Sequence, residues 1–291
     1  GGPHAEVNAI RSASQDLSSA EIYVSLEPCS HHGKTPPCAD LIIDEKLSGC
    51  KISQIDPNRK VSGQGIQKLK EAGIETMVGL EDEAGADLLR PFKIQQRYHR
   101  PYIILKWAQS CDGYLGLEGH RTKISHPLTD RLVHKWRSEV DAIMVGSNTV
   151  QIDNPHLGNR LFWGNKPIRV VLDRKMKLSD NATIFQEGIQ TLYFSTASRS
   201  FSGESTKSIV LESQENLKEL TQALFKHSVG TLMVEGGAIL LHHFLSENLW
   251  DEIRIINSPK ILGRGIKAPL IGHRECKNFQ LAEDRINLWY Q

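Results

Sequence analysis

Short apolar runs alternate with helical patterns along the first part of the chain. The β-rich runs lie at 22–26, 51–55 and 74–78, and the helical patterns at 3–14, 39–46 and 65–72. Strands that are separated by helical segments predict a mainly parallel sheet with helices on its faces. A polar stretch at 93–100, closed by Pro101, is interpreted as the join between two domains.

The same alternation resumes after Pro101. Strands are predicted at 102–106, 142–145, 168–172, 191–194, 208–211, 231–234 and 252–256, with helices at 127–139 and after Gly237. A chain of 291 residues is long for one domain and suits two. We therefore expect two α/β domains, at 1–97 and 98–291.

The charge balance and the lengths of the apolar runs limit which kinds of binding partner the chain can have. The chain has 35 basic and 34 acidic residues, a net charge of +1, so no overall field attracts nucleic acid. No apolar run reaches the roughly 18 residues of a membrane span, and the first residues lack the basic and apolar regions of a signal peptide. Five cysteines, an odd and sparse number, favour reduced thiols. We expect a cytoplasmic protein that acts on a small molecule, without a nucleic-acid or membrane partner.

A candidate metal site begins at His4-Ala5-Glu6 and continues with Cys29 and Cys38. One imidazole and two thiolates suit Zn²⁺, and three protein ligands leave a fourth position for water, whose pKa zinc lowers to about 7. Glu6 could then carry protons, as the glutamate of zinc deaminases does. Each residue alone could equally be a packed core residue. Eight residues separate the two cysteines, whereas the general deaminase signature is Pro-Cys-x-x-Cys.

A second candidate site follows the predicted strand at 231–234. Gly236 and Gly237 stand between this strand and a helix, where glycines let the backbone approach a pyrophosphate. By itself the pair is weak evidence, and a tight turn is the commoner explanation. Neither this pair nor Gly63-x-Gly65, which we interpret as a turn, matches the Gly-x-Gly-x-x-Gly fingerprint.

These motifs together resemble a known family. The run from Leu26 to Asp40 with its long cysteine spacing, Asp56-Pro57-Asn58, Asp153-Asn154-Pro155 and Val234-Glu235-Gly236-Gly237 are similar to the bifunctional riboflavin-biosynthesis deaminase–reductases. The resemblance implies a cytidine-deaminase-like three-layer domain followed by a dihydrofolate-reductase-like α/β domain. It also implies homo-oligomers, as dimers or tetramers.

The resemblance implies two reactions in sequence. The first domain would deaminate 2,5-diamino-6-ribosylamino-4(3H)-pyrimidinone 5′-phosphate, with zinc on His4, Cys29 and Cys38 and with Glu6 as the proton carrier. The second domain would use NADPH to reduce the ribosyl group to a ribityl chain. His31 and Lys34 would bind the first substrate, although their residue types alone favour a solvated loop.

The resemblance also assigns the reductase residues. Those at the second substrate would be Arg137, Leu157, Arg160 and Glu235; those at the cofactor would be Ala108, Thr149, Asp153, Arg174, Gly236, Gly237, Ala238 and Ile239. Guanidinium groups suit a ribose 5′-phosphate, and Arg174 could meet the cofactor's 2′-phosphate, although surface salt bridges are the commoner role of arginine. Lys106 and Asp112 would lie in the same pocket. Arg121 and Lys123 replace residues that are usual in the family.

One departure from the family concerns the start of the sequence. Family members usually carry a longer segment before the His-Ala-Glu motif, which forms the first helix and two strands of the deaminase domain. We therefore expect an N-terminally incomplete first domain. The alternative function is a reductase alone, with the first domain as an oligomerisation scaffold. A deaminase of nucleic-acid bases is disfavoured because the balanced charge provides no basic surface.

Overall fold

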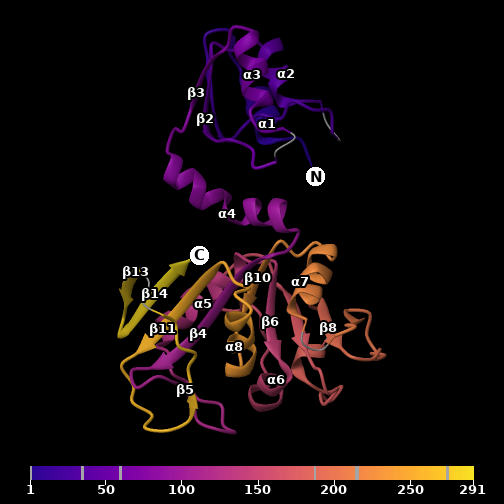
Figure 1. The fold of residues 1–291 in the computed structure, drawn as a ribbon, viewed down its shortest axis with the longest axis vertical. Coiled ribbons are helices and arrows are strands. Elements are labelled where there is room, and N and C mark those ends of the chain that lie inside the picture. The colour runs from indigo at the N-terminus through magenta and orange to yellow at the C-terminus, as the bar shows by residue number, and fades with distance from the viewer. Residues whose placement is uncertain (1, 34–35, 59–60, 187, 214–215, 273–274) are drawn as a thin grey trace. The chain divides into compact units, whose positions relative to one another are not determined.

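The computed structural model divides the chain into two compact units, residues Gly1–Tyr98 and His99–Gln291 (Figure 1). The structure describes residues 2–33, 36–58, 61–186, 188–213, 216–272 and 275–291. Within these ranges, no helix combines the length and the apolar character of a membrane span.

The first unit is a parallel sheet with helices. Its elements are α1 (Ala5–Ser12), β1 (Glu21–Leu26), α2 (Cys38–Asp44), β2 (Gly49–Gln54), α3 (Gln64–Glu71), β3 (Glu75–Val78) and α4 (Asp82–Tyr98). The strands are ordered β1-β2-β3 and all pair in parallel. Apolar side chains of α2, β2 and α3, including Ile42, Ile52 and Leu69, form its core. The predicted parallel sheet is thus confirmed for this unit.

The two units divide after Tyr98, within the stretch 93–100 that was interpreted as the join, and residues 93–98 of that stretch are helical. Residues Asp82–Tyr98 form one helix of 17 residues, α4, with Pro91 inside it. Among its described residues only Gly85 is buried, so apolar packing contributes little to holding it in place. Polar contacts hold it instead: Lys93 Nζ donates to Gln54 Oε1 (2.6 Å), and the Gln54 amide donates to the carbonyl of Asp82 (2.9 Å).

The second unit has a long mixed sheet. Its elements are β4 (Tyr102–Ser110), β5 (Tyr114–Gly116), α5 (Pro127–Ser138), β6 (Ala142–Gly146), α6 (Ser147–Asp153), β7 (Ile168–Leu172), η1 (Thr183–Phe185), β8 (Thr191–Ser195), β9 (Thr206–Val210), α7 (Leu217–Lys226), β10 (Thr231–Val234), α8 (Ala238–Ser246), β11 (Glu252–Ser258), β12 (Ile266–Lys267), β13 (Lys277–Leu281) and β14 (Asp284–Tyr290). The nine strands of the main sheet are ordered β13-β14-β11-β4-β10-β6-β7-β8-β9. The pairs from β11 to β9 are parallel, and β13 and β14 add an antiparallel edge.

In this topology the carboxyl ends of the parallel strands form the edge of the sheet at which a ligand would bind. β6 runs directly into α6, and β10 runs through Glu235, Gly236 and Gly237 into α8. The carboxyl ends of parallel strands lie at the same edge, where α/β proteins bind their ligands. Residues of the central strands, such as Leu105, Met144 and Val234, are almost fully buried and keep this edge rigid.

Candidate active sites

Three candidate metal ligands of the first unit converge. His4 immediately precedes α1, Cys29 follows β1, and Cys38 is the first residue of α2. Their ligand atoms all lie within 4.8 Å of one another. The amide of Cys38 donates to Cys29 Sγ (3.3 Å), and that of Ala39 donates to the carbonyl of Cys29 (3.1 Å), so the start of α2 closes the loop between the cysteines.

The donor set and its spacing fit zinc. Cys29 Sγ and Cys38 Sγ lie 3.7 and 3.3 Å from His4 Nδ1. Tetrahedral zinc with ordinary bond lengths places a sulfur and a nitrogen ligand about 3.6 Å apart. Burial, followed by the nearby charges of Glu6 and Cys29, raises the pKa of the Cys38 thiol well above its usual value. A divalent cation reverses this effect because it stabilises the thiolates.

Two of the other predicted deaminase residues, Glu6 and His31, are among the described residues. Glu6 is half-buried in the first turn of α1 and close enough to Cys38 to influence its pKa. His31 is exposed in the loop after Cys29. Lys34 lies outside the described residues.

Sequence reasoning missed Glu27, which connects two loops at this site. It is 5% exposed and lies two residues before Cys29. Its carboxylate accepts hydrogen bonds from four backbone amides, those of Asp56, Gly63, Gly65 and Ile66, at 2.9–3.3 Å. A side chain at Gly65 would meet the carbonyl oxygen of Pro28 at 2.0 Å. Only glycine therefore fits at position 65. Residues 61–63 form a turn that leads into α3, and Glu27 holds both the turn and the start of the helix.

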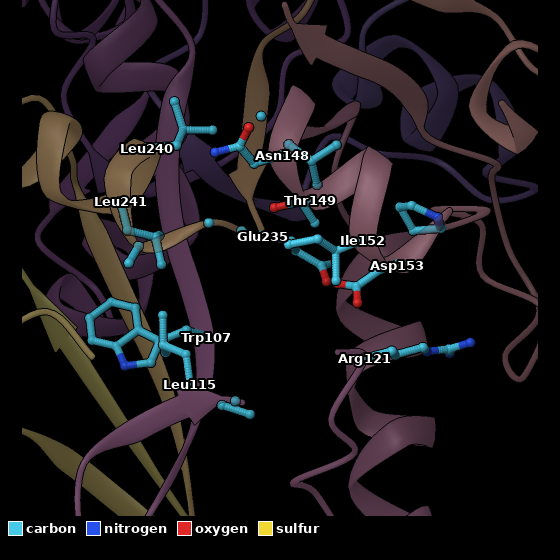
Figure 2. A pocket seen from close by; sticks show the side chains of 18 of the residues that line it. Trp107, Leu115, Arg121, Asn148, Thr149, Ile152, Asp153, Glu235, Leu240 and Leu241 are labelled. Carbon is cyan, nitrogen blue, oxygen red and sulfur yellow. The ribbon is translucent and has the colours of Figure 1, made fainter. Parts of the chain in front are cut away.

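The second unit contains a large cavity at the carboxyl edge of its sheet, with a volume of about 1110 Å³. Ligand pockets are usually about 300–1,000 Å³, so this one has room for two ligands. All twelve predicted reductase residues line it: Ala108, Arg137, Thr149, Asp153, Leu157, Arg160, Arg174, Glu235, Gly236, Gly237, Ala238 and Ile239. Figure 2 shows Thr149, Ile152 and Asp153 on α6 across the space from Trp107 and Leu115.

A carboxylate between two cations forms part of the cavity wall. Glu235 accepts from Arg137 Nε and Nη2 at 2.6 and 2.7 Å, and from Lys106 Nζ at 3.4 Å. Their side chains are only 5–16% exposed. Burial opposes ionisation of Glu235, but Arg137 and Lys106 outweigh it and lower its pKa to about 2. Burial lowers the pKa of Lys106. The predicted substrate residues Arg137 and Glu235 are thus partners of each other.

The glycine pair fits a phosphate-bearing cofactor. Gly237 precedes α8 with φ of 72°, a conformation that favours glycine. A Cβ at Gly236 or Gly237 would lie 3.2–3.3 Å from Thr149 Oγ1, so side chains would crowd this space. On the same cavity wall, Arg174 contacts His243 Nδ1 (2.8 Å), and its buried Nε has no hydrogen-bond partner among the described residues. Backbone amides at a helix start and an unsatisfied guanidinium N–H are suited to phosphate groups.

The structure corrects one predicted cavity residue. Asp112 does not line the cavity and instead accepts from the amides of Leu262 (3.1 Å) and Gly263 (2.7 Å). A hydrogen bond with Ser110 and those amides lower its pKa to about 2. It therefore fixes two loops to each other.

Arg121 and Lys123, which replace residues usual in the family, both line the cavity. Lys123 forms an ion pair with Asp130 (2.7 Å). Burial raises the pKa of Asp153, and the charge of Arg121 opposes this shift. Sequence reasoning missed His134, which also lines the cavity. It lies three residues before Arg137 in α5, so the helical spacing could have placed it on the same face.

The family models divide the chain into the same two kinds of region. Residues 1–53 match the cytidine and deoxycytidylate deaminase zinc-binding region, and residues 101–287 match the RibD C-terminal domain.

Relatives match across both regions. The chain is 36% identical to the riboflavin biosynthesis protein RibD of Aquifex aeolicus over 95% of this chain and 80% of that protein. It is 36% identical to RibD of Chlamydia pneumoniae over 94% of this chain and 76% of that one. It superposes on a solved diaminohydroxyphosphoribosylaminopyrimidine deaminase/5-amino-6-(5-phosphoribosylamino)uracil reductase from Thermotoga maritima with a TM-score of 0.88 and 30% identity, covering 99% of this chain and 85% of that one. The corresponding values for Acinetobacter baumannii RibD are 0.87, 30%, 99% and 85%. The chain therefore belongs to the RibD family, the bifunctional zinc-dependent deaminases and NADPH-dependent reductases of riboflavin biosynthesis.

Proposed function

We propose that the chain deaminates 2,5-diamino-6-ribosylamino-4(3H)-pyrimidinone 5′-phosphate in its first unit and reduces the ribosyl group of the product to a ribityl chain in its second. The convergence of His4, Cys29 and Cys38 carries the first half of this proposal. The cavity lined by all twelve predicted reductase residues supports the second half.

In the deaminase unit, His4, Cys29 and Cys38 would hold zinc. When bound, zinc supplies a Lewis acid that makes a water molecule nucleophilic near neutral pH. Glu6, beside Cys38, would take a proton from this water and deliver it to the leaving amine. His31 and Lys34 would bind the substrate from the loop between the two cysteines. Glu27 would keep that loop fixed against the start of α3.

In the reductase unit, Gly236 to Ile239, Ala108, Thr149, Asp153 and Arg174 would position NADPH, which supplies a hydride. Hydride transfer to the ribosyl carbon must be matched by a proton on the ring oxygen that leaves it. Lys106 and Glu235 share a contact at which such a proton can be held.

The cationic side chains would bind the second substrate. Of the five N–H donors of Arg137, Glu235 and the carbonyl of Gly158 take three, which leaves two for the substrate. Arg160 is exposed at the cavity and forms no ion pair among the described residues, so its guanidinium is available for a phosphate. Leu157 would contact the same ligand.

We also infer a homo-oligomer, a dimer or tetramer, that functions in the cytoplasm. The location is supported by the chemistry of the metal site. Cys29 and Cys38 lie close together as free thiols, and zinc binding requires that they stay reduced.

Two measurements test the proposed function: ammonium release and NADPH oxidation. Purified protein with the diamino substrate and NADPH should release ammonium and then oxidise NADPH. NADPH oxidation with the deaminated substrate but no ammonium from the diamino substrate would leave only the reductase. Absence of NADPH oxidation with the deaminated substrate would refute the second half of the proposal.

A further inference from the structure

Arg169 is a buried cation that the proposed chemistry does not use. It lies on β7, is 1% exposed, and forms no ion pair with a carboxylate among the described residues. Its guanidinium binds carbonyl oxygens instead. Nε donates to His156 (3.0 Å), and Nη1 donates to Ile184 (3.0 Å) and Gln186 (3.2 Å). A buried charge that is held by neutral acceptors and by no carboxylate needs a structural or functional reason.

The same guanidinium fixes the ring of His156. Arg169 Nη2 lies 3.3 Å from His156 Nε2, and because a guanidinium can only donate, Nε2 must be the acceptor. The ring is then neutral, with its proton on Nδ1. Burial and the charge of Arg169 lower the pKa of His156, in agreement with this state. A side chain at Gly158 would approach His156 Nδ1 to 2.9 Å, so the ring and the turn that follows it pack closely.

The turn after His156 holds one predicted substrate residue, Leu157, in an unfavourable backbone conformation. Leu157 has a φ of 53°, in the left-handed region that branched side chains rarely adopt, and it is 4% exposed in the cavity wall. The next carbonyl, that of Gly158, accepts from Arg137 Nη1 (3.1 Å). Arg169 therefore holds one end of the turn, and Arg137 holds the other.

We propose that Arg169 is a positioning residue of the reductase, which holds the turn His156–Gly158 so that Leu157 and Arg137 are placed for the pyrimidine ribosyl phosphate. The inference rests on the proposed reductase function, because Leu157, Arg137 and Arg160 would bind that substrate. Arg169 itself does not line the cavity. Its effect should therefore appear in substrate affinity and not in cofactor affinity.

The test compares Arg169→Lys with a matched control, Arg199→Lys. Lysine keeps the charge of Arg169 but presents a compact ammonium that cannot reach all four acceptors. Arg199 is also largely buried, at 16% side-chain exposure, but pairs with Asp180 and does not line the cavity. For Arg169→Lys we expect KM for the deaminated substrate to rise about tenfold or more, while Kd for NADPH stays within about twofold. Arg199→Lys should leave both constants unchanged.

A purely structural role gives a different result. It lowers the melting temperature and the active fraction but leaves KM of the folded molecules unchanged, and that outcome would overturn the proposal. If Arg169→Lys does not fold, Gly158→Ala displaces the His156 ring from the other side and should raise KM with unchanged NADPH affinity. An unchanged KM in that variant also overturns the proposal. Failure of the wild type to reduce the deaminated substrate would instead refute the proposed function, and this inference with it.

Discussion

Replacing Glu235 by glutamine removes the carboxylate that forms ion pairs with both Arg137 and Lys106 while preserving the shape of the side chain. The pKa of Glu235 is about 2 instead of 4.5, and each unit of pKa is 1.36 kcal/mol, so the ionised carboxylate stabilises the fold by on the order of 3 kcal/mol relative to its protonated form. Breaking one side of a buried ion pair typically costs about 3–5 kcal/mol. Both arguments give the same magnitude.

The five tryptophans allow the effect to be measured in the second unit alone, because all of them lie beyond residue 98. For a domain of this size, about 3 kcal/mol lowers the melting temperature by roughly 6–12 °C. We therefore expect the fluorescence-detected transition of Glu235→Gln to fall by this amount at pH 7. Glu139→Gln removes an exposed partner of Lys135 and should cost under about 1 kcal/mol.

The pH dependence has a defined sign. Since the folded-state pKa of Glu235 is lowered, its contribution is complete above about pH 4.5 and is lost as the pH falls towards about 2. The stability difference between wild type and Glu235→Gln should therefore shrink over that interval. A variant as stable as wild type at pH 7, or a difference that stays constant down to pH 2, would show that the carboxylate is not held as the structure indicates.

Three further predictions concern single residues. Cys38→Ala should lose bound zinc and ammonium release but keep NADPH oxidation with the deaminated substrate; retained zinc by elemental analysis would contradict this. Gly237→Ala adds a methyl 3.2 Å from Thr149 Oγ1 at a positive φ and should weaken NADPH binding about tenfold by calorimetry, whereas Gly272→Ala, which lies outside the cavity and where a methyl meets nothing within 4 Å, should bind normally. Glu27→Gln removes acceptors from buried amides and should destabilise the first unit by at least about 2 kcal/mol, seen as faster hydrogen exchange at residues 63–66; unchanged exchange would exclude that role.

The strands and the metal ligands were predictable because each carries a local signal. β6 and β10 are continuous apolar runs, as buried parallel strands are. The metal ligands are recognisable from residue type and order. The helices α4 and α7 also carry apolar periodicity, and α7 buries Leu217, Leu220 and Leu224, so both could have been predicted. By contrast, α6, β5, β12 and β13 are short or exposed, so their patterns are weak. Whether such short or exposed segments form helices or strands depends on tertiary contacts, which the sequence pattern does not show.

Pairings between distant side chains were not predictable. Arg137 and Glu235 were both assigned to the substrate, but only the folded structure shows that they bind each other across 98 positions of sequence. Glu27 and Arg169 have no motif of their own, and their roles depend on backbone groups that come together in the fold. A buried polar group must find partners wherever the topology supplies them.

The central claim, that one chain carries a zinc deaminase and an NADPH reductase in separate units, is tested most directly by removing the metal. Chelator-treated protein should neither release ammonium nor oxidise NADPH with the diamino substrate, yet should oxidise NADPH at the normal rate with the deaminated substrate; added zinc should restore both steps. Ammonium release from metal-free protein, or loss of reduction of the deaminated substrate on chelation, would contradict the account.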